Sequence, residues 1–355
     1  MMKWIDQPTQ TRHGEELDAA ALERYLKDGL PELTGDLVIE QFPGGFSNLT
    51  YMVRVGEREM VLRRPPFGLK IKSAHDMNRE YTILSRLQGA YDKAPRPLLY
   101  TADESIIGAE FYVMERVRGV ILRPSAPREM HPQPHLMRDI SLSLVDGLVE
   151  LHAVDLEAAG LSDFGRPKGY VGRQIHGWTR RWQKGMTDSV PAMDEAAAWL
   201  ADNMPTESGA SLIHNDYKYD NLILDPNDWS QIIAVLDWEM STVGDPLMDL
   251  GMALMYWVQP DDPIIVERLG RGATMLPGNI TRREFVDRYT DKSGRDIDNI
   301  HFYYAFGAFK LGVILQQIYK RWKLGHTKDT RFAGLLEAVQ ACGAIAVNAI
   351  EAESI

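Results

Sequence analysis

The segment LIHNDYKYDN at residues 212–221 decides how the rest of this chain is interpreted. It places His214, Asp216 and Asn221 at the spacing His-x-Asp-x4-Asn, and the apolar run Leu222–Leu224 follows at once. The short apolar run Leu212–Ile213 precedes His214. Because short apolar runs bounded by polar residues are typical of buried strands, we expect two strands to flank this polar loop and hold it rigidly.

A second aspartate lies where the next apolar run, Ile232–Leu236, ends at Asp237. The loop spacing is that of the kinase catalytic loop, in which the aspartate meets the acceptor hydroxyl and the asparagine binds metal. Hard cations such as Mg²⁺ prefer oxygen ligands. We therefore predict Asp216 as catalytic base, Asn221 and Asp237 as Mg²⁺ ligands, and His214 as a brace. A lone His-x-Asp is more often a cap or turn, so the prediction depends on the complete pattern.

The composition is that of an ordinary folded protein, with 355 residues and 45% hydrophobic residues. Its formal net charge of −11 argues against nucleic acid as a partner. The N-terminus shows no signal-peptide pattern, and the longest apolar stretch, Leu247–Val258, is short and contains Asp249. We therefore expect a cytoplasmic protein without membrane insertion. Cys342 is the only cysteine, which excludes internal disulfides. Monomer and homodimer both remain open.

The hydrophobic patterning divides the chain into a strand-rich first third and a mainly helical remainder. This predicts an α+β fold of two lobes: a helical extension at 1–34, an N-lobe at 35–117 with an antiparallel sheet and a helix, and a mainly helical C-lobe at 118–355. Expected strands are Leu37–Phe42, Thr50–Val55, Glu59–Arg63, Leu98–Ala102, Glu110–Glu115, Ala210–Ile213, Leu222–Leu224 and Ile232–Leu236. Expected helices cover 18–29, a stretch capped by Ser73, 134–151, 172–184, 192–203, 245–258, 281–291, 300–323 and 331–352.

The motifs around both aspartates resemble the aminoglycoside phosphotransferase and choline kinase family of the protein-kinase-like superfamily. The resemblance rests on residues 212–216, 235–239 and 244–250. Residues 61–66, 73–75 and 79–81 are similar, more specifically, to the kinase-like domain fused to some acyl-CoA dehydrogenases. The resemblance covers roughly residues 35–340. It implies a bilobal protein-kinase-like fold and a protein that uses ATP and Mg²⁺.

By position, the resemblance also implies a nucleotide site in the N-lobe. The loop Pro43–Asn48 would cover the phosphates with backbone N–H groups, because glycine permits close approach. Val61 would roof the adenine, and Arg63, where the family usually has lysine, would reach the phosphates with Glu80 as its ion-pair partner. A hairpin turn and a solvated Arg and Glu are the alternatives. The other residues expected to bind nucleotide are Gly44, Gly45, Ser47, Asn48 and, through their backbones in a hinge, Glu115 and Val117.

The acceptor is expected to be a small molecule with a hydroxyl group, bound near two basic stretches. The first lies between Gly165 and Gly185 and contains no acidic residue; the second runs from Lys310 to Arg331. Such charge would attract an anion and repel a polycationic aminoglycoside. We therefore expect an anionic or acyl-bearing acceptor such as a hydroxyacyl-CoA, although solvated helix faces are an equal alternative. The residues expected to contact it are Arg173, Trp178, Arg181, Lys218 and Glu239.

Three other interpretations compete with this one. A pseudokinase that binds nucleotide or acts as a scaffold is favoured by Arg63, and a kinase of aminoglycosides or other aminoalcohols belongs to the same family. A metal hydrolase that uses His214 lacks a second histidine at ligand spacing. Asp245 and Asp249 are expected to be structural, as an N-cap and as a carboxylate in the first helical turn.

Overall fold

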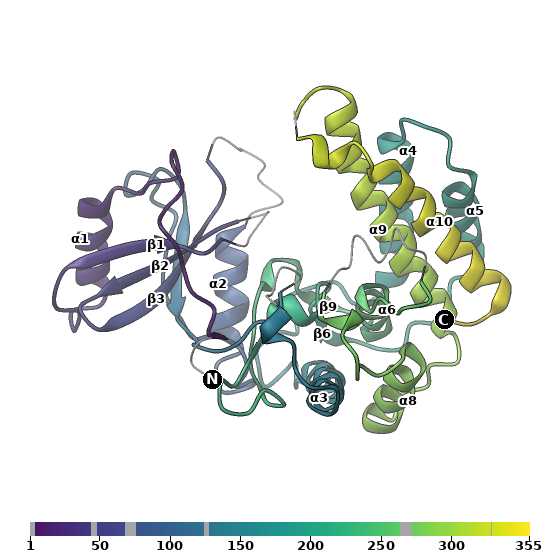
Figure 1. The fold of residues 1–355 in the computed structure, drawn as a ribbon, viewed down its shortest axis with the longest axis horizontal. Coiled ribbons are helices and arrows are strands. Elements are labelled where there is room, and N and C mark those ends of the chain that lie inside the picture. Colours follow the sequence, from purple (N-terminus) through teal and green to yellow (C-terminus); the bar gives the residue numbers. More distant parts are fainter. Residues whose placement is uncertain (1–3, 44–47, 68–75, 124–127, 263–271, 328) are drawn as a thin grey trace. The chain divides into compact units, whose positions relative to one another are not determined.

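The computed structural model describes residues 4–43, 48–67, 76–123, 128–262, 272–327 and 329–355. The chain forms two compact units. The first combines Met1–Ile121 with Glu157–Gly160 and Leu222–Glu239, and the second combines Leu122–Leu156, Leu161–Asn221 and Met240–Ile355. The predicted α+β class is confirmed, since an antiparallel sheet precedes a mostly helical remainder (Figure 1).

A five-stranded antiparallel sheet forms the centre of the first unit, in the order β1-β2-β3-β5-β4. All its strands were predicted. Their bounds are β1 Leu37–Gln41, β2 Leu49–Val55, β3 Arg58–Arg64, β4 Pro97–Thr101 and β5 Phe111–Glu115. β3 lies inside the sheet between β2 and β5, and its residues 60–64 are buried, so side chains on both faces of the strand are covered.

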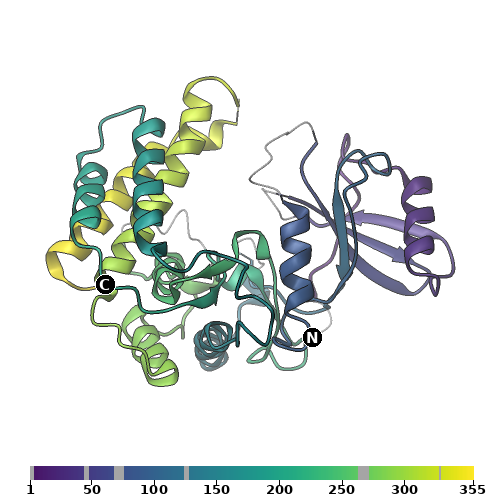
Figure 2. The ribbon, with the colours of Figure 1, turned by 180° about the vertical axis from the view of Figure 1, so that it is seen from behind.

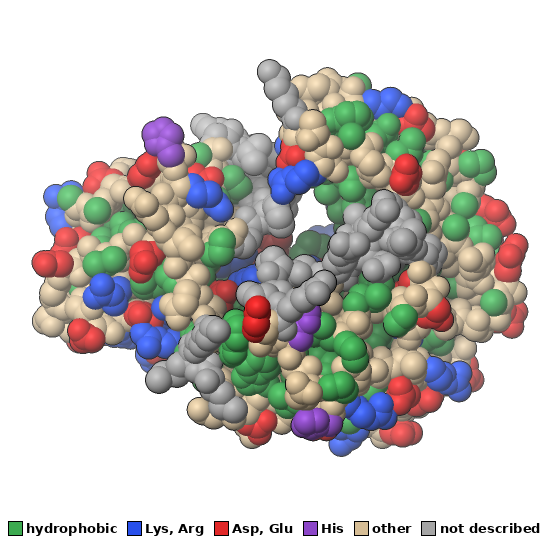
Figure 3. Space-filling model, in the orientation of Figure 1, with side chains coloured by type: hydrophobic (Ala, Val, Ile, Leu, Met, Phe, Trp, Pro, Cys, Tyr) green, Lys and Arg blue, Asp and Glu red, His purple; other side chains and the backbone are tan. Residues whose placement is uncertain are grey.

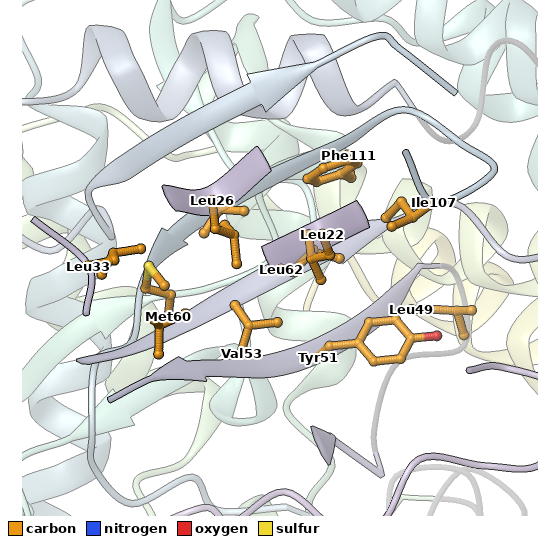
Figure 4. Close-up of a cluster of buried hydrophobic side chains, with 12 residues drawn as sticks. Leu22, Leu26, Leu33, Leu49, Tyr51, Val53, Met60, Leu62, Ile107 and Phe111 are labelled. Carbon is orange, nitrogen blue, oxygen red and sulfur yellow. The ribbon is translucent and has the colours of Figure 1, made fainter. Parts of the chain in front are cut away.

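Helices cover both faces of this sheet, α1 (Ala19–Gly29) on one and α2 (Met77–Arg86) on the other (Figure 1). Leu22 and Leu26 of α1 join a buried apolar cluster with Leu62 of β3 (Figure 4). Strand side chains alternate, so the neighbouring Arg63 points to the opposite face, where it contacts α2. The alternation thus delivers one charged side chain to the α2 side without disturbing the apolar cluster.

The start of α2 differs from the prediction. Asp76 is the N-cap, and its carboxylate accepts a hydrogen bond of 2.8 Å from the backbone N–H of Arg79. Ser73 had been expected to cap this helix but lies outside the described residues. Both residue types are good N-caps, so the sequence alone could not choose between them.

The strands beside the polar loop do not pair with each other. β6 (Ser211–Ile213) pairs with β9 (Thr242–Gly244), and β7 (Leu222–Leu224) pairs with β8 (Ile232–Val235). β7 and β8 belong to the first unit because the backbone N–H of Leu224 bonds Val120 and that of Val235 bonds Lys93. We had assigned these strands to the C-lobe by their order in the chain.

The second unit is built around α9 (Figure 2). α4, α5, α6 and α10 pack against α9, while α3 packs against α8. α6 and α9 approach closely, since a Cβ at Gly251 would lie 2.2 Å from the carbonyl oxygen of Tyr303. The bounds are α3 Pro134–His152, α4 Tyr170–Gly185, α5 Pro191–Asp202, α6 Pro246–Tyr256, α8 Arg282–Ser293, α9 Ile300–Lys323 and α10 Leu335–Ala352.

One segment, Thr330–Ala352, is long and apolar enough to cross a bilayer by composition, which the sequence analysis overlooked. In the structure its main helix, α10, packs against α9 and α5 and buries Val339, Cys342 and Ala346. Core helices commonly have such composition. The absence of membrane insertion stays a prediction.

Candidate active site

The polar loop is held in place by a buried carboxylate from α6. Asp249 is fully buried, and its two oxygens accept hydrogen bonds from the backbone N–H groups of His214 (2.6 Å) and Asn215 (2.7 Å). His152 lies 3.1 Å from the same carboxylate through Nε2. Although burial acts to raise the pKa of Asp249, the hydrogen bond and charge of His152 lower it. Asp249 is therefore structural, as predicted, but it anchors the loop in addition to lying in the first helical turn.

Two residues in the candidate site adopt backbone conformations that side chains other than glycine rarely take. Asn215 has φ of 64° and Asp237 has φ of 66°. Left-handed non-glycine residues cost free energy and cluster at functional sites. Asn215 is stabilised there by the Asp249 bond and by its own side-chain amide, which donates to the Met240 carbonyl at 3.1 Å. The strained backbone thus lies at Asp237, a predicted Mg²⁺ ligand, and at Asn215, next to the predicted base Asp216.

Asp216 is surrounded by groups that orient its carboxylate. Lys218 Nζ lies 2.9 Å from Oδ1, and the Asn221 side-chain amide donates to Oδ2, also at 2.9 Å. The hydroxyl of Tyr256 lies beside the same carboxylate, and burial together with Asp216 raises the pKa of Tyr256 well above its ordinary value. His214 is fully buried and its Nδ1 accepts from the Asp216 backbone N–H at 3.3 Å, which agrees with a bracing role. Asp216 is thus a partly exposed carboxylate with a fixed direction.

The side-chain amide of Asn221, which is predicted to bind Mg²⁺, is held in one orientation by Asp216. Its Nδ2 is occupied by two oxygens of Asp216, at 2.8 and 2.9 Å, so its Oδ1 must face the other way. Within the described residues that oxygen accepts no hydrogen bond. Asp237, in the first unit, carries a carboxylate with 32% of its side chain exposed. Amide and carboxylate oxygens are both ligand types that Mg²⁺ accepts, and the binding of one ion by these two residues stays a prediction.

The first unit contains a buried charge network centred on Arg63. Its guanidinium forms ion pairs with Glu80 and, at 2.9 Å, with Asp237. Arg63 is 7% exposed and Glu80 1%, so the alternative of two solvated side chains is excluded and the predicted ion pair is confirmed. Although burial acts to lower the pKa of Arg63, Glu80 and Asp237 raise it well above its ordinary value. A permanently charged guanidinium therefore holds the predicted metal ligand Asp237 in place.

The structure describes only some of the other residues that are expected to bind nucleotide. Gly44, Gly45 and Ser47 lie outside the described residues. Asn48 is buried and donates to Glu239 at 2.8 Å. Glu239 had been expected at the acceptor, but this bond places it in the first unit beside the network of Arg63.

The predicted hinge lies at the end of β5. Glu115 ends the strand, and Val117 follows it and packs against an apolar cluster that contains Ile121, Ile223 and Ala234. Within the described part of the chain, the backbone N–H of Val117 donates to no acceptor. Val61 is buried on β3 and pairs with Met114 of β5. The positions suit an adenine contact, which stays a prediction.

The basic residues of α4 and α9 have different partners. Arg173 donates to the backbone carbonyls of Arg166 and Lys168, so it fixes the loop before α4. Lys323 pairs with Asp188 at 2.6 Å. Similar local pairing is common on surfaces, and Figure 3 shows basic and acidic side chains interspersed on the face drawn. Arg173 and Lys323 are therefore already engaged by neighbouring groups, as is Lys320, which donates to the backbone carbonyl of Lys184.

Lys310 and Arg181 differ from these residues. Both lie near the ring of Trp178, with Lys310 Nζ 5.5 Å and Arg181 Cζ 4.4 Å from its centroid. Lys310 is 3% exposed. Arg181 and Trp178 are among the residues predicted to contact the acceptor, whereas in the sequence Lys310 is recognisable only as the start of a basic run. A lone lysine inside the apolar stretch Phe302–Val313 was the signal that could have identified it.

Comparison with known proteins was made by family and by sequence. Residues 38–285 match the model of the phosphotransferase enzyme family. The chain is 36% identical over 329 residues to acyl-CoA dehydrogenase family member 11 from Gallus gallus, covering 90% of this chain and 41% of that protein. It is 38% identical over 313 residues to family member 10 from Mus musculus, covering 87% and 29%. The chain thus spans about two fifths or less of these relatives.

Solved structures show the same fold. A crystal structure from Ralstonia eutropha, proposed to be an aminoglycoside phosphotransferase, has a TM-score of 0.79 and 29% identity, and covers 95% of this chain and 99% of that one. A complex of aminoglycoside phosphotransferase APH(4)-Ia with ADP and hygromycin B has a TM-score of 0.60 at 18% identity, covering 92% and 98%. The predicted resemblance and the protein-kinase-like fold are therefore confirmed.

Proposed function

We propose, because this chain belongs to the phosphotransferase enzyme family, that it transfers the γ-phosphate of ATP to a hydroxyl group of a small molecule. The observation that carries the proposal is the geometry of Asp216. Its carboxylate is fixed by Lys218 and Asn221 at 2.9 Å each, and the loop that carries it is anchored by Asp249. Positioning and electrostatics are the main contributions that a protein makes to phosphoryl transfer.

In this proposal Asp216 accepts the proton of the acceptor hydroxyl as that oxygen attacks the γ-phosphorus. The bond between the γ-phosphorus and the β–γ bridging oxygen breaks, and ADP leaves with the bond electrons. Lys218 lies next to the carboxylate and neutralises part of its charge. Arg63 supplies a fixed positive charge in the first unit, with Glu80 holding its direction. Arg63 thus takes the place of the usual lysine at the phosphates.

Asn221 and Asp237 supply oxygen ligands suited to Mg²⁺, which when bound would neutralise charge on the phosphates. The fit rests on the outward Oδ1 of Asn221 and on the partly exposed carboxylate of Asp237. No group of three His, Cys, Asp or Glu side chains suited to a metal occurs in the described residues. A site with one carboxylate and one amide does not need such a group.

The acceptor in this proposal is anionic or acyl-bearing, for example a hydroxyacyl-CoA. Support comes from the basic residues of the second unit near Trp178 and from the names of the acyl-CoA dehydrogenase relatives that share this region. An aminoglycoside or aminoalcohol acceptor is favoured by the proposed role of the Ralstonia protein. Clustered cations disfavour that alternative, because they would repel a polyamine.

A metabolite-pool screen for ATP consumption tests the function, with hydroxyacyl-CoAs and aminoglycosides both included. We expect turnover with hydroxylated anions and none with polyamine sugars. A preference for polyamine sugars would contradict the proposed acceptor. If no compound is phosphorylated while nucleotide binds, the pseudokinase alternative, which Arg63 motivates, is correct. The matched variant Asp216→Ala must abolish any turnover that is found.

A further inference from the structure

The second unit contains two cations that share one aromatic ring and form no ion pair with any residue that the structure describes. Lys310 of α9 and Arg181 of α4 lie 5.5 and 4.4 Å from the centroid of Trp178. Neither side chain makes a hydrogen bond or ion pair with any residue in the described ranges. Burial is the main cause that lowers the pKa of Lys310; Asp249 and Asp216 oppose this shift, and Arg181 adds to it, because like charges that converge on one site repel each other. The arrangement is therefore unfavourable for the protein alone.

Burial makes this arrangement still more costly. Lys310 is 3% exposed and lies between apolar residues of α9. A buried charge normally requires a partner or becomes neutral, and burial lowers the pKa of Lys310 to about 8. The face of an aromatic ring compensates only part of the lost hydration. The described residues thus provide a positive site that an anion would stabilise.

Lys310 also lies within electrostatic reach of the candidate base. The carboxylates of Asp249 and Asp216 both act to raise its pKa. α9 packs directly against α6, which carries Asp249 and Tyr256, and the Tyr256 hydroxyl lies beside Asp216. Lys310 and Asp216 thus belong to one electrostatically coupled part of the second unit.

We propose that Lys310 and Arg181, across the ring of Trp178, bind an oxyanion of the phosphate acceptor. This inference rests on the proposed function for the link to Asp216 and deepens it. The acceptor would carry its hydroxyl and its oxyanion a short chain of atoms apart, with the oxyanion as a carboxylate or a phosphate. The bound oxyanion would accept hydrogen bonds from the Lys310 ammonium and the Arg181 guanidinium.

Isothermal titration calorimetry without nucleotide tests this binding directly. The probes are β-hydroxybutyrate, the matched diol butane-1,3-diol, which lacks the carboxylate, and coenzyme A with inorganic phosphate. We expect the wild-type protein to bind at least one oxyanion at millimolar concentration and not to bind the diol. If the affinity for β-hydroxybutyrate depends on Lys310, the oxyanion of the acceptor is a carboxylate. If the affinity for coenzyme A or phosphate depends on Lys310, it is a phosphate group.

Variants of neighbouring cations provide matched controls. Lys310→Met should weaken oxyanion binding by about tenfold or more, and Arg181→Met by less, because Arg181 is exposed. Lys320→Met on the same helix and Arg180→Met beside Arg181 should leave the affinity within about twofold of wild type. Equal binding of acid and diol, unchanged affinity in Lys310→Met, or no binding of any oxyanion would each overturn the proposal.

Thermal unfolding separates a binding role from a structural one. If Lys310 serves the acceptor, Lys310→Met should keep or raise the melting temperature of the ligand-free protein, because it removes an unpaired buried charge. A lower melting temperature would show that Lys310 stabilises Trp178 instead. Since neither experiment uses ATP, a protein that binds oxyanions through Lys310 but never transfers phosphate would refute the proposed function and leave the oxyanion site without its link to Asp216.

Discussion

The two units of this protein each bury a cation, but they surround it differently. Arg63 in the first unit is paired with both Glu80 and Asp237. Lys310 in the second unit is just as buried, yet it makes no hydrogen bond or ion pair with any described residue. An ion-paired network is in place before its ligand arrives, whereas a buried cation without a hydrogen bond or ion pair still requires an anion. We infer that the site of Arg63 is preorganised for nucleotide, whereas the site of Lys310 becomes charge-compensated only when the acceptor binds.

The largest effect should come from the residue that we expect to perform the chemistry. Asp216→Asn removes the proton acceptor while an amide still fits between Lys218 and Asn221. Turnover should fall by ~10²–10⁴, and ATP affinity should stay close to wild type, because Arg63 and Asp237 belong to the first unit. Steady-state kinetics and nucleotide titration measure the two quantities. Unchanged turnover would refute the role of Asp216.

Breaking the ion pairs of Arg63 tests the first half of the comparison. Arg63→Met leaves Glu80 and Asp237 without their cation and should cost about 3–5 kcal/mol of unfolding free energy. Arg63→Lys keeps the charge but cannot hold both carboxylates with a planar fork, so it should cost less. Denaturant unfolding of both variants gives the comparison. Equal stability of Arg63→Met and wild type would show that these ion pairs do not stabilise the fold in solution.

Removing Asp237 should affect the binding of Mg²⁺ more than the stability of the fold. Asp237→Ala eliminates one oxygen ligand and should weaken Mg²⁺-dependent ATP binding by about 10–100-fold or more. Glu80 still pairs with Arg63 in this variant. Nucleotide titration with and without Mg²⁺ separates the two contributions, since binding without the metal should change far less. Equal Mg²⁺-ATP affinity in the variant and wild type would contradict the assignment of Asp237.

The smallest effect should be the pH dependence of oxyanion binding by Lys310. Burial lowers the pKa of Lys310 to about 8, although Asp249 and Asp216 oppose the shift and Arg181 adds to it. Lys310 is therefore charged below pH 8 and loses its charge above it, so oxyanion affinity should fall by up to about tenfold per pH unit above that value. Lys310→Arg should give a flatter profile. A wild-type affinity that is constant up to pH 10 would contradict the role of Lys310.

The same shift predicts the direction of a stability change. Unfolded lysine stays protonated up to a pH of about 10.4, whereas folded Lys310 loses its proton near pH 8. The unfolded state therefore binds more protons between these values, and the contribution of Lys310 to stability rises with pH across that window. Lys310→Met should lack this contribution in denaturant unfolding at several pH values.

Local pattern was enough to predict the strands of the first unit and the catalytic loop. The loop was recognisable because His214, Asp216 and Asn221 lie within one short segment. The role of Asp249 as an anchor was not predictable, because its hydrogen bonds to residues 214 and 215 depend on how α6 packs. The pairing of β6 with β9 depends in the same way on residues far along the chain.

The partners of charged residues were equally hidden from sequence. Arg173 and Lys310 both belonged to basic stretches, but Arg173 is bound to backbone carbonyls and Lys310 is buried without a partner in the described residues. Counting charges cannot separate these cases, since the difference arises from tertiary packing. The Arg63–Glu80 pair could be predicted because the resemblance supplied the long-range relation.

The central claim is that phosphate passes from ATP to a hydroxyl group of an oxyanion-bearing acceptor. Phosphorus NMR of the protein with ATP, Mg²⁺, a hydroxyacyl-CoA and an aminoglycoside at equal concentration tests it most directly. We predict that a phosphate ester forms on the hydroxyacyl compound together with ADP. A phosphate ester on the aminoglycoside, or ATP that remains intact with every acceptor offered, would contradict the claim.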